Sequence, residues 1–138
     1  MIDFVFHEVE KPHDFDANAH WLIESANTLF PSIAYVQYVF CTDEHLLELN
    51  RSSLNHDYYT DIITFDLRDT SKDALEAELY ISLDRIKDNA TRYSCTFAEE
   101  IRRVMIHGLL HLNGLNDSTD EEKTNMRRME NKFLETFK

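Results

Sequence analysis

The sequence predicts a single α+β domain over residues 1–138, with a mixed sheet of about four strands and about five helices. Segments in which apolar and polar residues alternate fall mostly in the first half of the chain, and segments with helical apolar spacing fall mostly in the second half. No repeat, low-complexity tract or linker rich in proline and glycine divides the 138 residues. A chain of this length suits one domain with a sizeable core.

Four segments are predicted to form strands. Residues 2–6 alternate between apolar and polar side chains, and residues 33–41 are rich in tyrosine, valine and phenylalanine. Residues 61–67 and 78–82 complete the set, and residues 68–76 between them are predicted to form a polar loop.

Five segments have the spacing of amphipathic helices. The first ends at Pro31, and the fourth opens with Thr96-x-x-Glu99, the pattern of a capping box. Either Ser118 or Thr119 can cap the last helix. The predicted helices cover residues 15–30, residues 42–49 and onward, residues 83–93, residues 96–112, and a final segment with the apolar stripe Met126, Met129, Phe133 and Phe137.

The composition favours a folded protein without a membrane span. Hydrophobic residues make up 43% of the chain, yet no apolar run approaches the roughly 18–20 residues that a spanning helix needs. The start of the chain lacks the pattern of a secretion signal, and Cys41 and Cys95 form no C-x-x-C pair, so we expect a cytoplasmic protein with reduced cysteines. A formal net charge of −12 repels nucleic acid at long range. A role on nucleic acid would therefore need a local cationic site, such as a metal ion with a few arginines.

The most informative segment runs from His107 to Asp117. His107 and His111 lie one turn apart on one helix face, so their ring nitrogens can reach one point. Gly114 stands where a helix needs a left-handed residue to end, and the returning chain can bring Asp117 to the same point. Two imidazoles and a carboxylate leave one position open on a tetrahedral cation, which is the pattern of a catalytic metal. We therefore predict one divalent ion, with zinc as first choice, at the C-terminal end of a central helix.

Other interpretations of these residues stay open. Asp117 could cap the last helix, although Ser118 and Thr119 can do so, and each histidine could be an ordinary core residue. The spacing is shared with zinc proteases of the metzincin type, in which a glutamate follows the first histidine and acts as general base. Gly108 occupies that position here and cannot transfer a proton, which argues against peptide hydrolysis.

The segment resembles the signature of the YbeY family of metal-dependent endoribonucleases, the rRNA maturation factors. The family motif H-G-x-L-H-L-x-G-Y-D-H is matched in register by His107, Gly108, Leu110, His111, Leu112 and Gly114. A second family block, L-N-x-x-Y-R-x-x-D-x-P-T-[ND]-V-L-S-F, is similar to the chain at Leu49-Asn50, Asp57, Thr60-Asp61 and Phe65, and the family strand G-D-I-x-I-S resembles Glu78–Ser82. The resemblance implies cleavage of single-stranded RNA in ribosomal RNA maturation, and the ribosome or its small subunit as a partner.

The chain departs from the family pattern at two positions that bear on chemistry. Asp117 occupies the position of the family's third histidine. A carboxylate in place of a neutral imidazole lowers the charge of the site and makes a bound water less acidic. Its oxygen ligand can also broaden the choice of metal toward manganese or nickel. Leu54 stands for the family arginine, which the resemblance implies contacts phosphate or assists catalysis. Arg51, one turn earlier, and His56 are the nearby substitutes, unless both are ordinary surface residues.

Three side chains are weaker candidates for catalysis. Glu100 lies two turns before His107 on the same helix face and is either a base or a carboxylate that interacts with the helix dipole. Asp61 either orients a ligand histidine or caps a turn before a strand. His56 is the third candidate.

The sequence thus predicts a metal-dependent endoribonuclease that acts on single-stranded RNA through metal-activated water, without a membrane partner. Its adjacent basic pairs, Arg102-Arg103 and Arg127-Arg128, are either contacts to RNA phosphates or ordinary surface charges. One alternative is a non-enzymatic ribosome-assembly factor whose metal only fastens the last helix to the histidine helix, and the charge of −12 favours it. The other alternative is a metalloprotease-like hydrolase.

Overall fold

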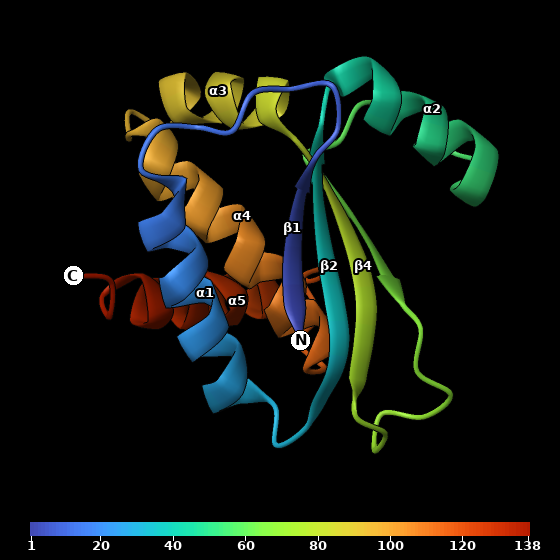
Figure 1. Ribbon diagram of the computed structural model, residues 1–138, viewed down its shortest axis with the longest axis vertical. Coiled ribbons are helices and arrows are strands. Elements are labelled where there is room, and N and C mark those ends of the chain that lie inside the picture. Colours follow the sequence, from blue (N-terminus) through green and yellow to red (C-terminus); the bar gives the residue numbers. More distant parts are fainter.

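A computed structural model describes residues 1–138, which form one sheet with helices on both of its faces (Figure 1). The strands are β1 (Ile2–Phe6), β2 (Ile33–Cys41), β3 (Ile62–Asp66) and β4 (Leu75–Ser82). They lie in the order β1-β2-β4-β3, in which β1, β2 and β4 are parallel and β3 is an antiparallel edge strand. The predicted α+β class and four-stranded mixed sheet are confirmed.

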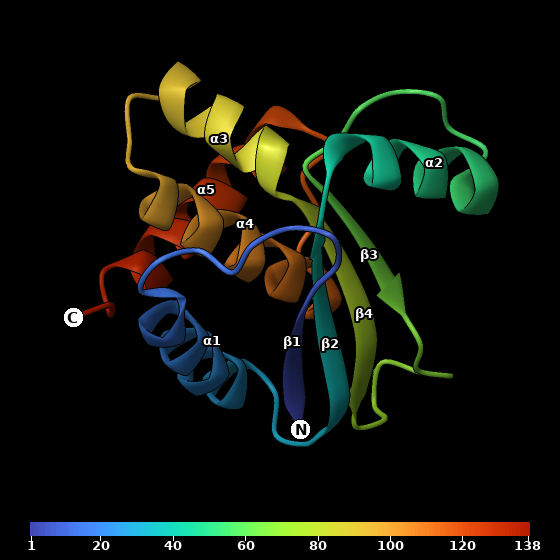
Figure 2. The ribbon, with the colours of Figure 1, turned by 45° about the horizontal axis from the view of Figure 1, so that its top comes forward.

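The five helices are α1 (Phe15–Leu29), α2 (Asp43–Leu54), α3 (Leu83–Arg92), α4 (Phe97–Leu112) and α5 (Asp120–Leu134). Helices α1 and α4 lie on one side of the sheet with α5 packed against α4, whereas α2 lies on the opposite side (Figures 1 and 2). Helix α3 follows β4 directly and packs against α4. None of the helices has both the length and the apolar character that crossing a membrane requires.

Apolar side chains that alternate along the strands contribute to two hydrophobic clusters. The large cluster joins the inward face of β2 and β4 to α1, α4 and α5, and a small one places Cys41 and Ile63 under Leu46 of α2. Tyr38 is fully buried in the large cluster, and its hydroxyl donates a hydrogen bond of 2.9 Å to the carbonyl of Met105 in α4. This bond satisfies the only polar atom of the tyrosine side chain and ties α4 to the centre of the sheet.

Helix α4 approaches the sheet most closely at Gly108. A Cβ atom at this position would lie 2.4 Å from Leu79 Cδ2 and 2.9 Å from Ile62 Cδ1. Because carbon atoms in contact are normally about 3.5–4.0 Å apart, only glycine fits without a shift of the surrounding structure. The residue next to His107 therefore sets the height of the histidine pair above β3 and β4.

Two predicted boundaries differ from the structure by more than one residue. Strand β4 begins at Leu75 instead of residue 78, because Leu75 is fully buried and pairs with Ile33 of β2, so part of the predicted loop is strand. Helix α5 ends at Leu134, and Phe137, predicted to lie on its apolar stripe, follows the helix. There its ring centroid lies 3.7 Å from the guanidinium carbon of Arg102, a cation–π contact.

Candidate metal centre

The end of α4 presents the histidine pair and then reverses the chain. The helix starts with the predicted capping box between Thr96 and Glu99. Gly114 has a φ of 97°, in the region that favours glycine, so the chain can turn sharply after His111. The N–H of Leu115 donates to the carbonyl of Leu110 at 3.0 Å and thereby closes the helix end.

The rings of His107 and His111 face the carboxylate of Asp117. The distance from Asp117 Oδ2 is 3.4 Å to His107 Nε2 and 3.3 Å to His111 Nε2, and one donor atom from each residue lies within 4.8 Å of the other two. Tetrahedral zinc with bonds of about 2.0–2.1 Å holds two donor atoms about 3.3–3.4 Å apart. The two distances from Asp117 Oδ2 therefore fit ligands of one cation.

The second ring nitrogen of each histidine is held by an oxygen atom. His107 Nδ1 lies 2.6 Å from Glu130 Oε2 of α5, and His111 Nδ1 lies 2.9 Å from the carbonyl oxygen of Leu115. A carbonyl or carboxylate oxygen accepts a hydrogen bond, so a neutral ring protonated at Nδ1 turns the lone pair of Nε2 toward Asp117. Histidines that bind metal commonly have this arrangement.

Glu130 is a supporting residue that the sequence reasoning missed. Its side chain is buried, and its second oxygen accepts a hydrogen bond of 2.8 Å from Arg103. Burial alone would raise the pKa of Glu130, but the hydrogen bonds from His107 and Arg103 outweigh burial and hold that pKa below its ordinary value. One signal was present, because Glu130 lies on the apolar stripe of α5 between Met126 and Phe133, where a carboxylate needs a partner.

Asp117 is free for a cation because another residue caps the following helix. The side chain of Thr119 accepts a hydrogen bond from the N–H of Glu122, and Glu122 completes a second capping box. Of the two predicted caps, Thr119 therefore serves as N-cap. The side chain of Asp117 is 41% exposed, so the carboxylate can bind a cation on a side that solvent reaches.

Asp61 and Glu100 lie together in a pocket beside His107. The pocket has a volume of about 180 Å³. It is lined by residues of α3, α4 and α5, by Tyr93 just after α3 and by Asp61 just before β3. The Asn89 amide donates to Asp61 Oδ2 at 3.3 Å and to Glu100 Oε2 at 3.5 Å. Burial raises the pKa of both carboxyl groups. Neither one is hydrogen-bonded to a candidate ligand histidine, and Glu130 makes the contact that one of the two interpretations of Asp61 predicted.

The third candidate, His56, lies in the exposed loop after α2. Its Nδ1 is 3.0 Å from the hydroxyl of Tyr58, and the two rings stack. Arg51, the expected substitute for the family arginine, pairs with Asp57 at 2.5 Å, and Leu54 is 41% exposed at the end of α2. Neither His56 nor Arg51 forms a hydrogen bond or ion pair with the three predicted ligands.

A second pocket, of about 670 Å³, is lined in part by His111 and the residues that follow it. One of its walls is Arg68, whose side chain is only 5% exposed. The guanidinium donates to the carbonyl of Leu112 at 2.7 Å and to Asp66 Oδ2 at 2.8 Å, which satisfies the C-terminal end of α4. Each of the two candidate histidine ligands therefore lines a pocket of its own.

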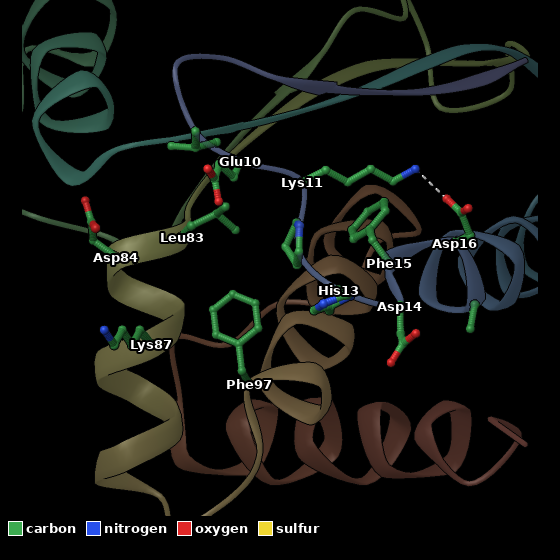
Figure 3. A pocket seen from close by; sticks show the side chains of 13 residues that line it. Glu10, Lys11, His13, Asp14, Phe15, Asp16, Leu83, Asp84, Lys87 and Phe97 are labelled. Carbon is green, nitrogen blue, oxygen red and sulfur yellow. Dashed lines mark ion pairs between the residues drawn. The ribbon is translucent and has the colours of Figure 1, made fainter.

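A larger pocket lies elsewhere (Figure 3). It has a volume of about 1110 Å³ and is lined by the segment from Val9 to Ala17 and by the first residues of α3 and α4. Lys11 extends along its rim to an ion pair of 2.6 Å with Asp16. None of the three candidate ligands contributes to it, so size alone does not locate the site with the metal-binding side chains.

The fold and the site together define a class: an α+β protein whose central helix and following turn offer three ligands to one divalent cation. The family model described as Endoribonuclease YbeY matches residues 7–138. The chain is 48% identical to Endoribonuclease YbeY of Cytophaga hutchinsonii and 45% identical to that of Bacteroides thetaiotaomicron, over 83% of this chain and 79% and 82% of those proteins. The solution structure of TM1509 from Thermotoga maritima has a TM-score of 0.71 and 25% identity, and the match covers 98% of this chain and 87% of that chain. The chain belongs to the YbeY family of endoribonucleases, and the resemblance seen in its motifs is confirmed.

Proposed function

We propose that this chain is an endoribonuclease that cleaves single-stranded RNA during ribosomal RNA maturation in the cytoplasm. His107, His111 and Asp117 are proposed to hold one divalent ion, with zinc as first choice, and the ribosome or its small subunit is the proposed partner. The observation that carries the proposal is the meeting of two Nε2 atoms and one carboxylate oxygen at separations of 3.3 and 3.4 Å. Membership in an endoribonuclease family supports RNA as the substrate.

The chemistry of the donor set fits a hydrolytic cation. When bound, such an ion supplies an acidified water and polarises a phosphodiester oxygen. Glu130 and the carbonyl of Leu115 fix the two histidine rings, which keeps both Nε2 lone pairs directed at one point. Asp117 adds a negative charge, so the site would carry about +1 in total and attract an anionic phosphate less than a site with three histidines would.

Asp61 is our candidate for the group that accepts a proton during hydrolysis. It shares a pocket with His107, and burial raises the pKa of its carboxyl group. A raised pKa brings a carboxyl closer to the pH at which the enzyme works, which suits proton transfer. Replacing Asp61 with asparagine should therefore lower kcat while zinc affinity, measured by chelator competition, stays unchanged.

The test is cleavage of a labelled single-stranded RNA by the purified chain. We expect a chelator to abolish cleavage, added zinc to restore it, and His107→Ala to be inactive. His20→Ala is the matched control, because His20 lies exposed on α1, and it should keep wild-type activity. Cleavage without metal, or an active His107→Ala variant, would falsify the assignment. Elemental analysis of protein purified without added metal identifies the ion.

One other function is favoured by two specific observations, the net charge of −12 and the leucine at position 54. In a non-enzymatic ribosome-assembly factor, the cation would only stabilise the contact of α4 with α5, through His107 and Glu130. Chelation would then lower the melting temperature, and zinc-loaded protein would leave RNA intact. A protease is disfavoured, because a glutamate in place of Gly108 would collide with Leu79.

A further inference from the structure

The pocket beside His107 contains a buried carboxyl group that accepts only long hydrogen bonds. Glu100 is 4% exposed, yet it receives only two long hydrogen bonds, from Asn89 Nδ2 at 3.5 Å and from the thiol of Cys95 at 3.8 Å. A buried carboxylate is stable when strong donors surround it. Glu100 therefore keeps acceptor capacity that a bound molecule could use.

Asn89 extends the row of acceptors along the pocket. Its Nδ2 donates both to Asp61 and to Glu100, which fixes the orientation of the amide. Its Oδ1 accepts no hydrogen bond from the protein and is left free for a ligand. The floor of the pocket thus offers oxygen acceptors from Glu100 and Asn89 within a space of about 180 Å³.

Arg127 and Tyr93 add a cation and an aromatic ring to the same pocket. Arg127 is exposed on α5, has no hydrogen-bonding or ion-pair partner, and acts electrostatically on Glu100. Arg103 also lines the pocket, but its guanidinium is bonded to Glu130 and Asn131. Tyr93 is 57% exposed, so its ring face is open to a stacking partner.

We infer that this pocket is a subsite that selects guanine in the RNA substrate, an inference that rests on the cleavage proposed above. Guanine presents N1–H and N2–H₂ donors beside its O6 and N7 acceptors, and arginine is the side chain that most often contacts O6 and N7. Glu100 supplies the acceptor and Arg127 the donor, while Tyr93 offers a face for stacking. Adenine, cytosine and uracil lack the adjacent pair of donors. The volume is below the roughly 300–1,000 Å³ of sites for drug-sized ligands, which suits one base.

Nucleotide binding to the full chain tests the inference without any cleavage. Titration with GMP, IMP, AMP, CMP and UMP keeps the ribose and phosphate constant, so contacts of the phosphate contribute equally. GMP should bind most tightly, and IMP, which lacks only the N2 amino group, should bind about tenfold more weakly. Equal affinity for GMP and IMP overturns the inference.

Two arginines on α5 provide a matched pair of variants. Arg127→Ala removes the guanidinium from the pocket, whereas Arg128→Ala removes a neighbouring exposed arginine that donates to Asn125. We expect Arg127→Ala to bind GMP about tenfold more weakly and Arg128→Ala to bind it as the wild type does. In Glu100→Gln, the preference for GMP over IMP should disappear. An effect of the same size in both arginine variants would mean only a loss of general charge attraction and would overturn the subsite.

Cleavage assays separate this inference from the proposed function. Short single-stranded RNAs that differ in one base next to the cut should be cleaved with kcat/KM about tenfold higher for guanine, and Arg127→Ala should lose that preference. Selective GMP binding without any RNA cleavage would support the guanine site and overturn the proposed function. RNA cleavage with no base preference, together with equal binding of the five nucleotides, would overturn the guanine site alone.

Discussion

Replacing Gly108 with alanine tests whether the close approach of α4 to the sheet positions the histidine pair. The added Cβ would lie 2.4 Å from Leu79 Cδ2, 2.9 Å from Ile62 Cδ1 and 3.4 Å from Thr64 Oγ1. Leu79 is fully buried, so its side chain has no solvent into which it can turn. The helix, the edge strand or both must therefore move, and His107 moves with the helix.

Two opposing effects set the size of the change in stability. Alanine is favoured over glycine in a helix interior by about 1 kcal/mol, whereas an extra carbon forced into a packed core costs about 1–3 kcal/mol. The steric cost is the larger one here because two contacts fall below 3 Å. We expect a net loss of about 1–2 kcal/mol, which corresponds to a fall in Tm of about 3–8 °C for a chain of 138 residues.

Urea and thermal denaturation of the metal-free protein measure this loss, and chelator competition measures the accompanying fall in zinc affinity. Gly114→Ala is the comparison, since a Cβ there meets no atom within 4 Å but the φ of 97° disfavours alanine. Its loss of stability should therefore arise from backbone strain alone. A Gly108→Ala protein as stable as the wild type, with unchanged zinc affinity, would show that the close contact does not position α4.

Three further variants test the supporting contacts. Replacing Glu130 with glutamine removes the charge beside His107 Nδ1, so chelator competition should show a zinc affinity about 10–100-fold lower. Unchanged zinc affinity would show that Glu130 does not support the histidine. Burial raises the pKa of Glu100 in the folded state, so the wild type should lose stability relative to Glu100→Gln as pH rises through that raised pKa. Below the ordinary pKa of glutamate the stability difference should become constant, and thermal melts across pH measure it. A difference that does not vary with pH contradicts this assignment. Thr119→Ala should cost about 1 kcal/mol in urea denaturation because α5 loses its cap, and Ser118→Ala should cost far less.

The features that could be predicted from the sequence depend on residues close together along the chain. The capping box at Thr96 occupies four consecutive positions, and the meeting of His107 with His111 follows from the pitch of one helix. The approach of Asp117 needs only a glycine turn of the kind that Gly114 makes. Such local rules do not depend on how the helices and the sheet pack together.

The features that could not be predicted depend on packing between distant segments. Glu130 reaches His107 only because α5 lies across α4, and no local pattern specifies that crossing. One of the two interpretations of Asp61 placed its carboxylate there, yet that carboxylate accepts a hydrogen bond from Asn89 instead. The early start of β4 at Leu75 likewise depends on its pairing with β2 across the sheet.

The three candidate ligands come from one uninterrupted stretch of chain, whereas Glu130 joins them from the next helix. The three candidate ligands can therefore meet once α4 and the turn after it have formed, without any contribution from the last helix. Docking of α5 adds the Glu130 carboxylate to His107 and so fixes the orientation of its ring. Changes in the packing of α5 against α4 would thus adjust the affinity of the site for a cation but would leave the three candidate ligands in place.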